Sequence, residues 1–318
     1  KQLSDIYGQK NEGGWFWTYS RNGAVQINKY DLSQWLYDNY VQLYFHDKKT
    51  GAYRLVHEEN RKIREIWAEN IKKYVKEKLV EAKHFDVLEA VIKSTNSIFT
   101  DSFFEYIDAS TAEILRDDKD TCYFPFNNTI VTISKNEIKT IKYSDITKSI
   151  WEAQIIDNDV TIIHDFEPKM SKYYQFIGKI SGDDEKRVNY AMTLIGYILH
   201  SYKDPSKPYA PILAEETDDE AKGGGTGKGI FFQAISKLIP VVRIDGKNFR
   251  PDKTFAFQRV TLGTKLVVIE DCPKNVDFER YYPTITEGMT IEKKNQDEMF
   301  LKFEESPKIA FTTNYTIN

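Results

Sequence analysis

The chain is predicted to contain an α+β region followed by an α/β domain with a mainly parallel sheet. The first observation is alternation of apolar and polar residues in stretches such as YFPFNNTIVTISKNEIKTIKY, which is typical of β-hairpins. The second is a set of apolar strands after residue 208, including KLVVIEDC and KIAFTTN, which alternate with a helical segment and favour a sheet buried on both faces. We expect residues 1–183 to form the α+β region, as one or two subdomains, and residues 184–318 to form the α/β domain.

The N-terminal elements follow from hydrophobic spacing and turn signals. WFWTYSRNGAVQI predicts a hairpin around Asn22-Gly23. Residues 32–44 have helix-like apolar spacing, and residues 58–83 predict a longer helix. The apolar stripe of that longer helix consists of Ile63, Ile66, Trp67, Ile71, Tyr74, Val75 and Leu79. A further helix is expected over residues 85–99.

The middle of the chain predicts a hairpin around Lys135-Asn136, a strand near residues 150–156, and helices over residues 169–180 and 185–202. The α/β domain then begins with a strand in YAPILAEE, which is followed by a glycine-rich run and a helix over residues 228–238. Three further strands are expected in PVVRIDG, KLVVIEDC and KIAFTTN.

Composition limits the classes of function. The 318 residues are 41% apolar and 14% aromatic, enough for sizeable cores, and the formal charge of −4 means that any DNA-binding surface is a local patch. No apolar run is long enough to span a bilayer, so no membrane partner is expected. The two cysteines, Cys122 and Cys272, lie far apart in sequence and indicate a reducing, cytoplasmic setting.

The run AKGGGTGKGIFFQAI, residues 221–235, has the composition of a phosphate-binding loop. Glycines permit positive φ and close approach to phosphates, and the N–H groups that open the following helix attract anions. We expect Lys228 to reach the phosphates, as in the pattern G-x-x-x-x-G-K-[ST]. The candidate nucleotide-binding residues are Gly224, Gly225, Thr226, Gly227, Lys228 and Gly229.

Two positions of this run depart from the pattern. Lys222 replaces the first glycine, and Gly229 replaces the hydroxyl that helps to hold Mg²⁺. Thr226 or a water molecule could take the place of that hydroxyl. The alternative interpretation is a flexible glycine-rich loop without a ligand.

Two later strands end in polar residues that suit nucleotide hydrolysis. Glu270 and Asp271 end an apolar strand, which fits a Walker B element: one acid holds the water shell of Mg²⁺ and the other polarises the attacking water. We assign Glu270 to the metal and Asp271 to the water, although the two roles could be exchanged. Asn314 follows the last strand and would orient water beside the γ-phosphate. Acids and amides at strand ends are also common as simple surface residues.

Taken in order, GGGTGKG, LVVIEDC and KIAFTTN resemble motifs A, B and C of superfamily 3 helicases, which are AAA+ motors of viruses and phages. The resemblance is strongest for the phage and poxvirus primase-helicases and covers residues 209–318. It implies an ATP- and Mg²⁺-dependent DNA helicase with Lys228, Glu270, Asp271 and Asn314 as catalytic residues. It also implies a homo-oligomer, a hexameric ring, on single-stranded or forked DNA in a bacterial or phage-infected cell.

The same resemblance implies a DNA-contacting hairpin between motifs B and C. Its arms would be residues 290–293 and 299–303, and Lys293 and Lys294 near its turn are the candidate DNA-binding residues. A solvated surface turn is the alternative. The family's arginine finger follows motif C, so we expect the finger and a fifth core strand to lie beyond residue 318.

Two other classes of function remain open. Gly229 motivates a nucleotide-binding initiation or assembly scaffold that does not unwind DNA. A P-loop kinase of small molecules is a third possibility, but it explains neither Thr313-Asn314 nor the long region that precedes the glycine-rich run.

Overall fold

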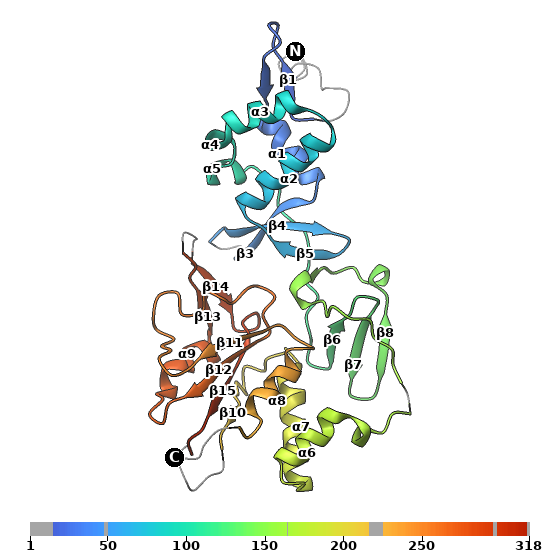
Figure 1. Ribbon diagram of the computed structural model, residues 1–318, viewed down its shortest axis with the longest axis vertical. Helices are drawn as coiled ribbons and strands as arrows, with labels where there is room; N and C mark the ends of the chain where they lie inside the picture. The colour runs from blue at the N-terminus through green and yellow to red at the C-terminus, as the bar shows by residue number, and fades with distance from the viewer. Residues whose placement is uncertain (1–14, 48–49, 164, 216–224, 295–297, 317–318) are drawn as a thin grey trace. The chain divides into compact units, whose positions relative to one another are not determined.

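The computed structural model describes residues 15–47, 50–163, 165–215, 225–294 and 298–316. The chain separates into two compact units, Lys1–Glu113 and Ile114–Asn318, and each is described by itself (Figure 1). The expected junction at residues 183/184 falls inside the second unit. The assignment of residue 184 as the start of the P-loop core remains a prediction.

The first unit combines short antiparallel strands with helices. In chain order its elements are β1 (Trp17–Tyr19), β2 (Val25–Ile27), α1 (Lys29–Asp38), β3 (Val41–Asp47), β4 (Ala52–Glu59), β5 (Lys62–Glu65), α2 (Ala68–Glu81), α3 (Phe85–Lys93), α4 (Thr95–Ile98) and α5 (Asp101–Phe104). The predicted hairpin is confirmed, because β1 pairs antiparallel with β2. Leu32, Ile71 and Leu79 are among the buried side chains that hold the unit's core.

Two predicted helices of this unit were wrong in part. The helix predicted over residues 32–44 ends at Asp38, and Val41 begins β3 instead. Residues 58–65 lie mainly in β4 and β5, and the following helix begins only at Ala68. Asn60 and Arg61 both have positive φ, at 52° and 64°, so they form the tight turn between β4 and β5. The charged residues around that turn have good helix propensity, but strand pairing overrides it.

The second unit begins with a three-stranded antiparallel sheet, which confirms the hairpin predicted around Lys135-Asn136. Its elements are β6 (Thr121–Pro125), β7 (Ile130–Ser134), β8 (Ile138–Ile141), β9 (Ile150–Trp151), α6 (Lys172–Ile180), α7 (Glu185–Leu199), β10 (Ile212–Leu213), α8 (Lys228–Ile235), β11 (Val241–Asp245), β12 (Leu266–Cys272), α9 (Tyr282–Thr286), β13 (Gly288–Ile291), β14 (Met299–Lys302) and β15 (Lys308–Thr313). The strand predicted over residues 150–156 is shorter, because a 3₁₀ turn begins at Glu152.

A four-stranded parallel sheet with the order β10-β15-β12-β11 forms the centre of this unit. Alternate residues of β12 face opposite sides. Leu266 and Val268 pack in one core with α6, α7, α8 and the antiparallel sheet, whereas Val267 and Ile269 pack in another with the β13–β14 hairpin. The predicted mainly parallel sheet, buried on both faces, is therefore present. Across the described ranges, no helix is both long and apolar enough to cross a membrane.

Candidate nucleotide site at the edge of the parallel sheet

The glycine-rich run leads directly into α8, as predicted. Gly227 caps the helix with φ +102°, and Gly225 has φ +80°, so both positions use backbone conformations that favour glycine. Lys228 is the first residue of α8, where free backbone N–H groups and the helix dipole attract anions. Gly224 and Lys222 lie outside the described residues.

The side chains of the loop contact an acid that the sequence did not point out. The Thr226 hydroxyl donates a 2.9 Å hydrogen bond to Oε1 of Glu215, and the Lys228 ammonium forms an ion pair with the same carboxylate. Glu215 lies two residues after β10, and its side chain is only 3% exposed. The only sequence signal for this residue was its place at the end of the strand in YAPILAEE.

Gly229 lies in the first turn of α8. Among the described residues, a Cβ atom placed there would meet only the Arg243 guanidinium, at 3.7 Å, which is an ordinary van der Waals distance. The missing hydroxyl at this position is therefore not imposed by packing.

Glu270 and Asp271 lie at the end of β12 but have different surroundings. Nε of Arg243, on the neighbouring strand β11, donates a 2.9 Å hydrogen bond to Oε1 of Glu270, and the same two side chains form an ion pair. Asp271 is exposed, has φ +52°, and donates its backbone N–H to the Thr312 hydroxyl at 3.0 Å. A register irregularity between Ile269 and Cys272 accompanies this conformation.

The strand registers bring the predicted polar residues to one edge of the sheet. Leu213 is level with Thr312, and Cys272 is level with Thr313. The Thr313 hydroxyl donates to the carbonyl of Cys272 at 3.0 Å, which ties the ends of β12 and β15 together. Glu215, Asp271 and Asn314 therefore all lie within two residues of these level positions, at the carboxyl edge where open α/β sheets bind ligands.

Helix α6, from the region that precedes the predicted motor, packs directly on the loop. A Cβ atom on Gly227 would lie 3.0 Å from the Phe176 ring and 3.1 Å from Ile180. The Tyr173 hydroxyl also donates to the carbonyl of Phe231, in α8, at 3.1 Å. Because the helix leaves no room for a side chain at position 227, it supports the loop from the side of the core.

A preformed metal cage is not found at this edge. In the described part of the chain, no group of three or more His, Cys, Asp or Glu residues could hold a metal ion. Mg²⁺ usually binds proteins through one or two carboxylates together with substrate phosphates and water, so Glu270 and Asp271 still fit that ion.

The candidate DNA-binding lysines lie beside the β13–β14 hairpin. The two strands pair antiparallel, so the expected hairpin exists. The first strand begins and ends two residues earlier than predicted, and the second begins at Met299 as predicted but ends one residue earlier. Lys293 is half-buried and already has an interaction partner within the chain, whereas Lys294 is exposed. Residues 295–297, between the two predicted arms, lie outside the described residues.

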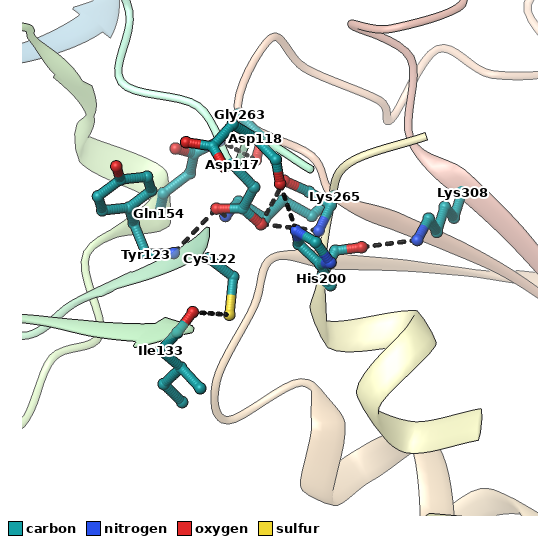
Figure 2. Close-up of polar contacts among 11 residues, drawn as sticks. Asp117, Asp118, Cys122, Tyr123, Ile133, Gln154, His200, Gly263, Lys265 and Lys308 are labelled. Carbon is teal, nitrogen blue, oxygen red and sulfur yellow. Dashed lines mark hydrogen bonds and ion pairs between the residues drawn. The ribbon is translucent and has the colours of Figure 1, made fainter. Parts of the chain in front are cut away.

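A second polar cluster, which the sequence did not indicate, surrounds Asp117 (Figure 2). It lies beside the residues that begin β12 and β15, at the end of the sheet opposite the glycine-rich loop. Asp117 accepts hydrogen bonds from the backbone N–H of Tyr123 at 2.9 Å and of Ser201 at 2.7 Å, and it pairs with Lys265 at 3.7 Å. Because these partners lie on β6, after α7 and just before β12, the cluster joins the antiparallel sheet and α7 to the parallel sheet.

Two further lysines near this end of the sheet are buried. The Lys308 ammonium donates to the carbonyls of Tyr197 and His200, at 2.6 Å each, at the end of α7. Burial, together with the nearby Lys203 ammonium, lowers the pKa of Lys308 to about 7. Burial also lowers the pKa of Lys203 to about 8.

No protein-family model and no curated protein matches the chain. Among solved structures, the chain is similar to one described as the A form apo structure of the NrS-1 C-terminal region, with a TM-score of 0.35 and 14% sequence identity. The match covers 63% of this chain and 55% of that chain, so it spans little more than half of the solved structure. This likeness is too weak to assign a function, and the assignment therefore depends on the geometry of the site.

Proposed function

We propose that the second unit is an ATP-hydrolysing motor module that acts on DNA as a helicase or translocase. The observation that carries the proposal is the shared carboxyl edge of the parallel sheet, where the strands that bear the three motifs lie side by side. A chance set of surface acids and amides has no reason to converge with a glycine-capped helix at this edge.

Each residue has a role in the proposal. Lys228 and the N–H groups that open α8 would bind the phosphates, and a bound Mg²⁺ would stabilise their negative charge. Glu270 and Asp271 divide the tasks of holding the metal's water shell and polarising the attacking water. Asn314 orients that water.

The proposal extends to partners. Superfamily 3 motors, which the motifs resemble, act as homo-oligomeric rings, so we propose a homo-oligomer, a hexamer, around single-stranded or forked DNA. Lys293 and Lys294 beside the β13–β14 hairpin would contact the phosphate backbone of that DNA without reading its sequence.

ATP turnover with and without single-stranded DNA tests the proposal. The Lys228→Ala variant is expected to lose about 10²-fold or more of the turnover rate, because it removes a charge that stabilises the phosphates in the transition state. Lys237→Ala, at an exposed position just after α8, is the matched control and should turn over ATP like the native chain. Absent turnover in the native chain, or equal turnover in both variants, would overturn the assignment.

A second candidate function is a nucleotide-binding scaffold that assembles on replication origins without unwinding. It is favoured by two observations: position 229 has no hydroxyl for the metal, and Arg243 already neutralises Glu270. A strand-displacement assay separates the two functions. Unwinding of a forked duplex with ATP supports the motor, whereas ATP binding and oligomer formation without unwinding support the scaffold.

A further inference from the structure

Glu215 is the buried acid that contacts both polar side chains of the glycine-rich loop. Its carboxylate accepts a hydrogen bond from Thr226 and forms an ion pair with Lys228, whose side chain is 13% exposed. A carboxylate buried to this degree needs charged or hydrogen-bonding partners, and both of the partners described above come from the loop. Glu215 therefore ties the loop to the end of β10.

The same ammonium is the group that the proposed function assigns to the phosphates. A phosphate at the start of α8 and the Glu215 carboxylate are both anions, and both favour contact with Lys228. Two anions close to one ammonium in a poorly solvated site repel each other, and such repulsion is much stronger than in water. Phosphate binding must therefore displace the carboxylate from Lys228 or tolerate it close by.

We propose that Glu215 is a competing anion that sets the affinity of the loop for phosphate groups. This inference rests on the proposed function, because it assumes that the loop binds a nucleoside triphosphate. In the ion pair, Glu215 holds Lys228 and Thr226 against the end of β10. Phosphates must then exchange with the carboxylate as they bind.

The opposite effect would follow if Glu215 only positioned Lys228. Holding one long side chain in a single rotamer improves affinity by up to about tenfold, since each immobilised side chain costs entropy on binding. Repulsion between a buried carboxylate and a triphosphate acts in the other direction and is on the order of tenfold or more. The sign of the change in affinity therefore separates a competing anion from a positioning residue.

Isothermal titration of the full chain with ATP, with and without Mg²⁺, tests this inference. Glu215→Gln keeps the shape of the side chain and an acceptor for Thr226 but removes the charge. We expect its Kd for ATP to fall about tenfold relative to the native chain. The matched control is Glu287→Gln, at an exposed position after α9, which should leave Kd unchanged.

A Kd for Glu215→Gln that equals or exceeds the native value would overturn the inference. If that variant does not unfold cooperatively on heating, Glu215→Asp serves instead, because it keeps the charge but draws it away from Lys228, and the Kd should then fall severalfold. Failure of the proposed function looks different: the native chain would not bind ATP at all, or Lys228→Ala would bind it equally well.

Discussion

Two glycines of the loop, separated by a single residue, have opposite tolerance for a side chain. Gly227 has φ +102° and lies against the Phe176 ring, so an alanine there would be both strained and overpacked. Gly229 is helical, and the nearest described neighbour of a Cβ atom there would be the Arg243 guanidinium, at 3.7 Å. Gly227 is thus required by the fold. Gly229 is not, and its main effect is that the site lacks a hydroxyl at this position.

Restoring the hydroxyl at position 229 should therefore improve metal use. We expect Gly229→Ser to lower the Mg²⁺ concentration that gives half-maximal ATP turnover by several-fold, because the serine adds an oxygen ligand where G-x-x-x-x-G-K-[ST] has one. A serine in place of glycine in the first turn should also slightly stabilise α8. Turnover is measured as a function of Mg²⁺ concentration at saturating ATP.

Gly227→Ala is the contrasting variant at the same loop. It should lose on the order of 1–3 kcal/mol of unfolding free energy and most of its ATP affinity, because the left-handed backbone and the Phe176 contact both resist a Cβ atom.

For the Gly229→Ser variant, an unchanged dependence of turnover on Mg²⁺ concentration would show that the metal is held elsewhere.

At the residue scale, the motif residues were accessible from the sequence and their partners were not. Lys228, Glu270 and Asn314 follow from motif spacing and strand ends. Their ion-pair partners, Glu215 for Lys228 and Arg243 for Glu270, depend on which strands become neighbours and in what register. No local pattern carries that information.

At the scale of elements, α6 links the preceding region to the loop. Its Phe176 ring lies over Gly227, and its Tyr173 hydroxyl bonds to the backbone of α8. The helix predicted over residues 169–180 is present as Lys172–Ile180, and the Ser171 side chain caps its N-terminus. Its contact with the loop was not predicted, because the sequence placed the helix before the motor core.

We expect Phe176→Ala to weaken the loop as well as the fold. Removing a half-buried ring should cost about 1–3 kcal/mol of unfolding free energy, somewhat less than a fully buried phenylalanine would. Because the ring supports Gly227, the Kd for ATP should also rise several-fold. Urea unfolding and ATP titration measure the two effects.

Tyr190→Ala, on α7, is the control for this prediction. Tyr190 is 73% exposed, and none of the described hydrogen bonds joins it to the loop or to α8. Both quantities should be nearly unchanged there. Loss of stability in Phe176→Ala with native ATP affinity would mean that α6 has only a packing role.

Across the second unit, the buried lysines make stability depend on pH. Lys308 and Lys203 have pKa values of about 7 and about 8, below the 10.5 of an unburied lysine. Between pH 7 and 9 the unfolded chain binds more protons than the folded chain, so stability rises with pH. Above about pH 9 the sign reverses, because burial raises the pKa of both cysteines from 9.0 to about 11 and the pKa of Tyr143 and Tyr173 from 10.0 to about 12. The unfolded chain then loses these protons before the folded chain does.

Urea unfolding from pH 6 to pH 10 measures this dependence. We expect the unfolding free energy to increase from pH 7 to a maximum near pH 9, with a slope of up to about 1.4 kcal/mol per pH unit for each lysine. Lys308→Met should flatten that slope. A stability that stays constant or falls between pH 7 and 9 in the native chain would contradict a neutral Lys308.

Hydrophobic spacing and turn signals were enough to predict the parallel sheet, α8 and the two β-hairpins, and the glycine-rich run and the strand ends named the motif residues Lys228, Glu270, Asp271 and Asn314 as candidates. These features depend on neighbours a few residues apart, where propensity and periodicity act. The β4–β5 turn, the compact unit that begins at Ile114, the Asp117 cluster and the Glu215–Lys228 pair were decided only by the tertiary structure. These features depend on burial and strand register, which are set by contacts between residues far apart in the sequence.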